Sequence, residues 1–245
     1  MKEIDIAIDT CELLRELADK VKVNQSPELG LLGGQAGQLL FLYNLAKCHP
    51  EIVKSELLSK RINNFTSNAI SRNPDASLGY GLAGIAWFYQ YILDDQKIED
   101  NENNSVDRFF WQILNVERWK GEFEFVLGLV GYTPYLMKRR HTPLGKKNLL
   151  HLVNKLSELA VYDEKDKCYW ATPETSKFRV QKNNTGLEEI NFGLAHGHVG
   201  VLAALAAICD EPFVKSKARK LLGAGCNWLL SNQQNVDQFG SYYPY

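Results

Sequence analysis

The sequence predicts an all-α fold built from repeated helix pairs, and three observations lead to that prediction. Four Gly-x-x-Gly pairs recur along the chain, beginning at Gly34, Gly81, Gly128 and Gly197. The first three lie 47 residues apart (81 − 34 and 128 − 81), a spacing typical of repeat architectures. An amphipathic helical pattern precedes each pair, and a more uniformly apolar run follows it. Each repeat is therefore expected to be an outer helix, a turn and an inner helix.

The expected outer helices each carry one stripe of apolar residues at helical spacing, which predicts half-exposed helices. The four stripes, in chain order, are Ile4, Ile8, Cys11, Leu14 and Ala18; Leu57, Leu58, Ile62, Phe65 and Ala69; Val106, Phe109, Phe110, Ile113 and Leu114; and Leu149, Leu152, Val153, Leu156, Leu159 and Ala160.

The expected inner helices are nearly all apolar and should be buried. They cover residues 39–46, 85–92 and 201–209, while the run after the third turn is shorter and contains Pro134. The enlarged connection at residues 163–192 is expected to hold a short hairpin and to shape a surface near the fourth turn. A fifth outer-type helix follows, around residues 213–229, with no inner partner after it. We therefore expect the chain to be truncated.

Composition and charge narrow the class of protein. The chain has 245 residues, 45% of them hydrophobic, and a net charge of −1, so it can bury a large core but has no footprint for nucleic acid or an anionic membrane. No apolar run reaches the roughly 18 residues of a membrane span. The charged N-terminus argues against a signal peptide, and five widely spaced cysteines indicate reduced thiols. A cytoplasmic protein is expected.

The fourth glycine turn contains two histidines, in Asn191-Phe-Gly-Leu-Ala-His-Gly-His-Val-Gly200. His196 is placed between open glycine backbone, where an imidazole could point into a cavity and exchange a proton near neutral pH. Hydrogen bonding to a neighbouring loop is the alternative role for His196. His198 is expected to be structural, since a His-x-His pair alone is a weak metal signal.

A pair of carboxylates precedes the third turn, in Gly121-Glu-Phe-Glu-Phe-Val-Leu-Gly128. If this stretch is extended, alternation places Glu122 and Glu124 on one face. They could be an exposed surface pair or a pair for acid–base chemistry. No phosphate-binding loop, nucleophile elbow or dinucleotide fingerprint is present.

The segment Gly193-Leu-Ala-His-Gly-His-Val-Gly200 resembles the Gly-Leu-Ala-His-Gly-x-x-Gly motif of the lanthionine synthetase C-like (LanC-like) cyclases. Residues 77–84 and 31–37 resemble earlier repeats of the same family. The similarity covers essentially the whole chain, but only the first four of the family's seven glycine turns. It implies an α/α toroid, with residues 1–245 forming a single domain that is truncated before the zinc-ligand repeats.

The resemblance also implies a function. Members of the family use zinc to add a cysteine thiol of a dehydrated precursor peptide to dehydroalanine or dehydrobutyrine, and a dehydratase is a possible partner. The family's zinc ligands lie in Trp-Cys-Tyr-Gly and Cys-His-Gly motifs, and neither motif occurs here. We therefore assign no metal ligand, and expect this chain alone to bind no zinc and to be inactive.

Two catalytic candidates follow from the resemblance. His196 matches the family's active-site histidine and would protonate or stabilise the enolate. Glu124 stands four residues before Gly128, where the family has an aspartate, and would act as a base or orienting group. Two other functions stay open, namely a peptide-binding scaffold without catalysis and an unrelated α/α-barrel hydrolase that uses Glu122 or Glu124.

Overall fold

A computed structural model describes residues 10–24, 26–98, 103–176, 179 and 189–243, and it confirms the all-α prediction. The elements are α1 (Thr10–Val23), α2 (Gln35–Cys48), α3 (Ser55–Ser71), α4 (Leu82–Gln96), α5 (Asn104–Leu114), the 3₁₀ turn η1 (Leu129–Tyr132), α6 (Thr133–Lys138), α7 (Pro143–Leu159), β1 (Val161–Tyr162), β2 (Cys168–Tyr169), α8 (His198–Ile208), α9 (Lys215–Ser231) and α10 (Val236–Phe239).

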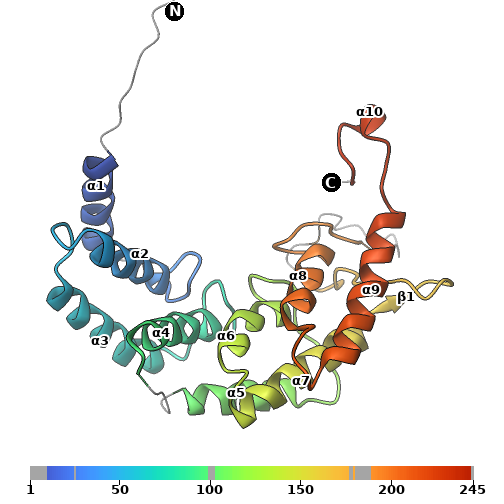
Figure 1. Cartoon of the computed structure of the whole chain (residues 1–245), viewed down its shortest axis with the longest axis horizontal. Coiled ribbons are helices and arrows are strands. Elements are labelled where there is room, and N and C mark those ends of the chain that lie inside the picture. The colour runs from blue at the N-terminus through green and yellow to red at the C-terminus, as the bar shows by residue number, and fades with distance from the viewer. Residues whose placement is uncertain (1–9, 25, 99–102, 177–178, 180–188, 244–245) are drawn as a thin grey trace, which may run out of the picture.

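The helices follow an open arc, as Figure 1 shows. Helices α4, α6 and α8 lie along the inside of the arc, and α3, α5 and α7 lie along the outside. The predicted alternation of outer helix, turn and inner helix is therefore confirmed for the described residues. Ile4 and Ile8, which were assigned to the first outer stripe, lie outside them, and the prediction of a single domain over residues 1–245 stays a prediction.

Local sequence explains where the middle helices begin. The hydroxyl of Thr142 accepts a hydrogen bond from the backbone N–H of Gly145 at 2.9 Å, and Pro143 occupies the first helical position of α7. Both are favoured at a helix N-terminus, where backbone N–H groups lack helical partners. Pro134 lies in the first turn of α6, and this helix is only six residues long. The third inner helix is thus short, as the sequence predicts.

The core forms two hydrophobic clusters that share α4. Ile85, Phe88 and Ile92 of α4 pack into the cluster of α1, α2 and α3, while Ala83 and Ala86 pack into the cluster of α5 to α9. Each fully buried leucine or phenylalanine contributes roughly 1.5–3 kcal/mol. Helix α4 therefore couples the two ends of the arc.

A buried polar network fixes the outer helices to the inner ones. Arg139 is 4% exposed and pairs with Asp107, which is fully buried, at 2.9 Å. The Tyr135 hydroxyl donates to Asp107 at 2.7 Å, Arg139 donates to Gln90 at 3.0 Å, and the Asn148 amide donates to the Asp107 carbonyl at 2.9 Å. Because the buried charges are paired and hydrogen-bonded, this network specifies how α4, α5, α6 and α7 pack.

The expected hairpin is present. It begins at Val161, two residues before the connection of residues 163–192 in which it was predicted. β1 pairs with β2 in an antiparallel register. Trp170, just after β2, is fully buried and donates its indole N–H to the Leu156 carbonyl at 2.8 Å. Burial raises the pKa of the Cys168 thiol to about 11. Residues 177–178 and 180–188 of the connection lie outside the described residues.

Two expectations about burial were wrong. Leu57 of α3 is 61% exposed, although it was placed on the buried stripe. Ala203, Ala206 and Ala207 of α8 are exposed, although this run was expected to be buried all round. No helix within the described residues is long and apolar enough to cross a membrane.

Candidate active site

The four glycine turns share one hydrogen-bond pattern. In each turn, the residue after the first glycine donates its backbone N–H to the carbonyl seven residues earlier. The four bonds are Gln35 to Glu28 at 2.9 Å, Leu82 to Asp75 at 2.7 Å, Leu129 to Glu122 at 3.0 Å and His198 to Asn191 at 2.7 Å. The sequence repeat is therefore a structural repeat at the level of single atoms.

The second glycine of each pair is required by a close backbone approach. A Cβ at Gly131 would lie 2.2 Å from the Phe125 carbonyl oxygen, and one at Gly200 would lie 2.4 Å from the Leu194 carbonyl oxygen. Real Cβ atoms do not approach backbone that closely, so no other residue fits without moving the turn. The glycines thus place the loop before each inner helix directly on that helix.

Neighbouring turns are hydrogen-bonded to one another along the arc. Successive turns are joined by backbone bonds from Leu32 to Gly79 at 3.0 Å, from Gly79 to Val126 at 2.9 Å and from Phe125 to Ala195 at 3.0 Å. The last of these bonds brings the carboxylates of the third turn next to the histidines of the fourth.

The structure brings together the two predicted catalytic residues. His196 Nδ1 lies 2.8 Å from Glu124 Oε2, although the residues are 72 positions apart in the chain. Glu124 is only 2% exposed, so the interpretation as an exposed surface pair is wrong for this residue. Its carboxylate also accepts the backbone N–H groups of Val126, at 2.9 Å, and Leu127. Glu122 is half-buried and serves the turn through its carbonyl.

The arrangement around Glu124 determines what His196 can do. An ionised carboxylate only accepts hydrogen bonds, so this contact favours a proton on Nδ1 of His196 and leaves proton transfer to Nε2. The side chain of His196 is 32% exposed, so a bound molecule can reach it. The pair can therefore orient an imidazole and exchange a proton, which is the requirement for general acid–base catalysis.

Glu124 accepts a backbone N–H that has an equivalent in the second turn, and it also contacts His196. Ser77 occupies the equivalent position in the second turn, and its hydroxyl accepts the backbone N–H of Tyr80 at 3.2 Å. Glu124 accepts the equivalent N–H, that of Leu127. Within the part of the chain that the structure describes, Ser77 has no contact with a histidine, so the Glu124–His196 contact distinguishes the third turn from the second.

His198 is a packing residue in this structure. It is fully buried, its Nε2 lies 3.1 Å from the Gly225 carbonyl, and its ring packs between Trp170 and Trp228 at centroid distances of 5.4 and 5.1 Å. Burial lowers the pKa of His198, which favours its neutral form. The geometry fits the structural role that the sequence predicted.

Sequence analysis missed Tyr132, which lies one residue after Gly131 and is 3% exposed. Burial, reinforced by the charges of Asp75 and Glu124, raises the pKa of Tyr132, so the phenol stays protonated. Because it lies in an apolar run, the sequence gave no sign that the charge of Glu124 acts on its hydroxyl.

An apolar cavity of about 380 Å³ lies between α6 and α8, and its lining residues do not include Glu124 or His196 themselves. Phe125, which follows Glu124, and Leu194, which lies two residues before His196, both line it. The rest of the lining is small or aliphatic, and it consists of Thr133, Pro134, Met137, Gly200, Ala203, Ala204 and Ala207.

The described residues do not form a metal centre. No three histidine, cysteine, aspartate or glutamate side chains among them lie close enough to hold an ion. The described residues therefore do not provide the ligands for the zinc ion that the family resemblance implies.

Comparison with known proteins places the chain in a family. Residues 25–244 match the family described as "Lanthionine synthetase C-like protein". The fold is similar to that of a solved protein named nisin cyclase, with a TM-score of 0.62 and 20% identity over 90% of this chain. The match covers 56% of that protein, so the chain spans little more than half its length. No curated protein matches the sequence. The chain belongs to the lanthionine synthetase C-like family.

Proposed function

We propose that this chain supplies the proton-transfer residues of a LanC-like peptide cyclase. The observation that carries the proposal is the 2.8 Å contact between Glu124 and His196, which joins two glycine turns of a family whose relative is named a cyclase. In the proposed reaction, a cysteine thiol of a dehydrated precursor peptide adds to a dehydroalanine or dehydrobutyrine and forms a thioether.

The atoms of this addition balance without any further reactant. The thiol loses its proton, its sulfur forms a bond to the β-carbon, and the electron pair of the double bond moves to the α-carbon and its carbonyl as an enolate. A proton then returns to the α-carbon. Nε2 of His196, oriented by Glu124, would take up the thiol proton and then deliver a proton to the α-carbon, so the product is an isomer of the substrate.

The apolar cavity gives the substrate a binding place along the two turns that carry the pair. Its lining by Phe125 and Leu194 places the space for an apolar side chain next to the two turns that carry Glu124 and His196. Holding a substrate residue there would position the dehydrated residue near the imidazole, and such positioning contributes strongly to rate.

Zinc stays an expectation for the complete family member. A bound zinc ion would supply a thiol deprotonated near neutral pH, but the described residues do not gather its ligands. We predict that the purified 245-residue chain binds no zinc stoichiometrically. Elemental analysis after dialysis checks this, and a value near one tightly held zinc per chain would contradict it.

The function is tested with a dehydrated peptide that contains one cysteine. Because cyclisation leaves the mass unchanged, ring formation is followed as the loss of the thiol that iodoacetamide can alkylate. The assay compares the product of the whole reading frame that encodes residues 1–245 with the 245-residue chain. We expect cyclisation by the former and none by the latter. If the whole-frame product binds the peptide without cyclising it, the scaffold function is supported and the proposal fails.

The hydrolase alternative gains nothing from the geometry. It needs a second carboxylate that faces Glu124, whereas the group that the structure places in contact with Glu124 is the imidazole of His196. The scaffold alternative stays open, and the experiment above decides it.

A further inference from the structure

A second recognition surface lies at the other end of the arc, along α3. Leu57, Arg61, Asn64 and Asn68 follow one another at helical spacing and form one stripe on this helix. Leu57 and Arg61 line an apolar pocket of about 350 Å³, and Arg61, Asn64 and Asn68 line a polar pocket of about 220 Å³. Since Arg61 lines both pockets, they adjoin at this residue, and we call the two together the α3 groove.

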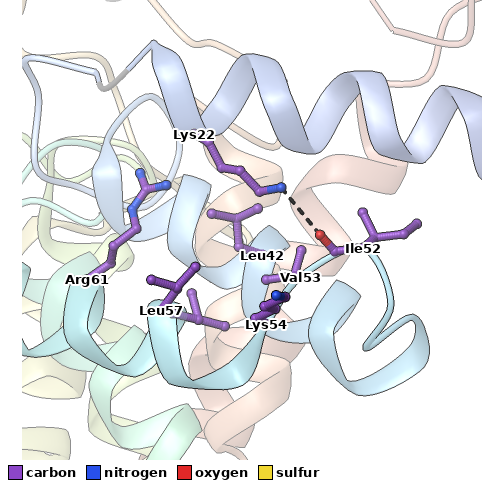
Figure 2. A pocket seen from close by; sticks show the side chains of 8 residues that line it. Lys22, Leu42, Ile52, Val53, Lys54, Leu57 and Arg61 are labelled. Atoms are coloured by element: carbon purple, nitrogen blue, oxygen red, sulfur yellow. Dashed lines mark hydrogen bonds between the residues drawn. The ribbon is translucent and has the colours of Figure 1, made fainter.

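The apolar part of the α3 groove has a cationic edge. Its floor includes Leu42 and Val53, which are 1% and 4% exposed, while Leu57 is 61% exposed at its rim. Figure 2 shows Lys22 and Arg61 at this pocket, with Lys22 donating to the Ile52 carbonyl at 3.3 Å. An aliphatic side chain that entered this pocket would have positive charge beside it.

The charges of the groove are only partly neutralised within the chain. Lys22 pairs with Asp19 at 3.0 Å. Lys54, which also lines the pocket, and Arg61 have no carboxylate within 4.0 Å among the residues that the structure describes. The surface therefore complements an acidic partner.

The polar part of the α3 groove is rich in side-chain amides. Gln35 and Gln38 of α2 line it opposite Asn64 and Asn68 of α3. The two glutamines donate to the carbonyls of Ser26 and Asn24, whereas Asn64 and Asn68 use their side-chain amides in no hydrogen bond within the described part of the chain. Primary amides donate and accept, which matches the alternating groups of a peptide backbone.

The spacing along α3 defines the kind of segment that fits. Eleven residues separate Leu57 from Asn68, which is about 16 Å along a helix, and an extended peptide covers that length with about five residues. The four residues from Leu57 to Arg61 span about 6 Å, close to the ~6.7 Å between alternate residues of an extended chain. A peptide with an aliphatic residue and an acidic residue two positions later would reach both sites.

We propose that the α3 groove binds an extended peptide segment with the pattern aliphatic-x-acidic, away from the residues that react. The aliphatic side chain enters the pocket beside Leu57, the carboxylate pairs with Arg61, and the amides of Asn64 and Asn68 bind the peptide backbone. The inference rests on the proposed function in one respect, namely that the segment is part of the substrate peptide.

Fluorescence anisotropy with the 245-residue chain tests the groove. The probe is fluorescein-labelled Gly-Leu-Ser-Asp-Ser-Gly, and the matched control peptide, Gly-Leu-Asp-Ser-Ser-Gly, has the same composition but the acid one position too early. We expect the probe to bind at least fivefold more tightly than the control peptide. Arg61→Glu should weaken probe binding at least tenfold, and raising the salt concentration should weaken it too.

Two further variants keep the test independent of folding. Arg108 of α5 is exposed and lines neither pocket, so Arg108→Glu is the matched control and should leave probe binding unchanged. Leu57→Asp changes an exposed side chain and should also weaken binding, with the thermal unfolding midpoint retained. Equal binding of the two peptides, or equal effects of the two arginine variants, would overturn the proposal. Self-association of the chain that is lost in Arg61→Glu, without probe binding, would assign the groove to a second copy instead.

The result of the anisotropy experiment can be distinguished from the result of the cyclisation assay. Probe binding requires no chemistry, so it can succeed when cyclisation fails. If cyclisation succeeds and the probe does not bind, the groove proposal alone is wrong.

Discussion

Replacing Glu124 with glutamine should destabilise the chain and change which ring nitrogen of His196 carries the proton. The carboxylate faces three donors, namely the backbone N–H groups of Val126 and Leu127 and Nδ1 of His196. Glutamine offers one carbonyl oxygen and one NH₂ group, so at least one buried donor loses its acceptor. Losing one charge-assisted hydrogen bond and leaving a buried donor unpaired costs about 2–4 kcal/mol. For a chain of this size, that lowers the unfolding midpoint by roughly 5–15 °C.

Two measurements check this prediction. Thermal unfolding gives the stability change, and ¹⁵N NMR of the histidine side chains gives the protonated ring nitrogen of His196. We expect Nδ1–H in the unmodified chain and loss of that preference in Glu124→Gln. The control is Glu122→Gln, which keeps the Glu122 carbonyl that the turn uses and should lower the midpoint much less. Equal shifts for the two variants, together with an unchanged His196 tautomer, would refute the reasoning.

The remaining predictions concern the fourth turn and its buried histidine. Gly200→Ala should lower the free energy of unfolding by roughly 2 kcal/mol or more, because the added Cβ would lie 2.4 Å from the Leu194 carbonyl oxygen. Gly223→Ala in α9, where a Cβ would have nothing within 4 Å, should leave the free energy of unfolding unchanged or raise it by up to about 1 kcal/mol. Urea titrations of the two variants measure both changes. Equal costs would contradict the close-approach argument. Burial lowers the pKa of His198, so its contribution to stability is complete above about pH 6.5 and is lost as the pH falls from there towards the lowered folded value. The unfolding midpoint should therefore fall more between pH 7.5 and 5.5 in the unmodified chain than in His198→Phe, and parallel curves would show that His198 does not contribute.

Much of the fold was predictable because its signals are local. The glycine pairs and the 3.6-residue periodicity each lie within one repeat, and they located the turns, the inner and outer helices and the short third inner helix. Two expectations stay predictions, namely that this chain alone binds no zinc and that residues 1–245 form a single domain. Burial was predicted less well, since exposure of Leu57 and of the alanines of α8 depends on what lies opposite them in space.

The two residues of the candidate site were named from the sequence, but their contact could not be predicted from it. His196 and Glu124 were identified through the family resemblance, but their contact depends on the Phe125–Ala195 hydrogen bond between turns. Alternation of Glu122 to Phe125 predicted both carboxylates on one face if the stretch were extended. The chain turns there instead, and Glu124 folds back onto two backbone N–H groups of its own turn. Tyr132 was missed because an apolar context hides a buried hydroxyl.

The rate of ring formation by His196→Gln tests the central claim most directly. The variant is made in the product of the whole reading frame, and its cyclisation of the dehydrated peptide is measured beside its affinity for that peptide. Loss of a general acid should lower the rate by about 10²–10⁴-fold with the affinity unchanged. A cyclisation rate within threefold of the unmodified protein would contradict the assignment of proton transfer to the Glu124–His196 pair.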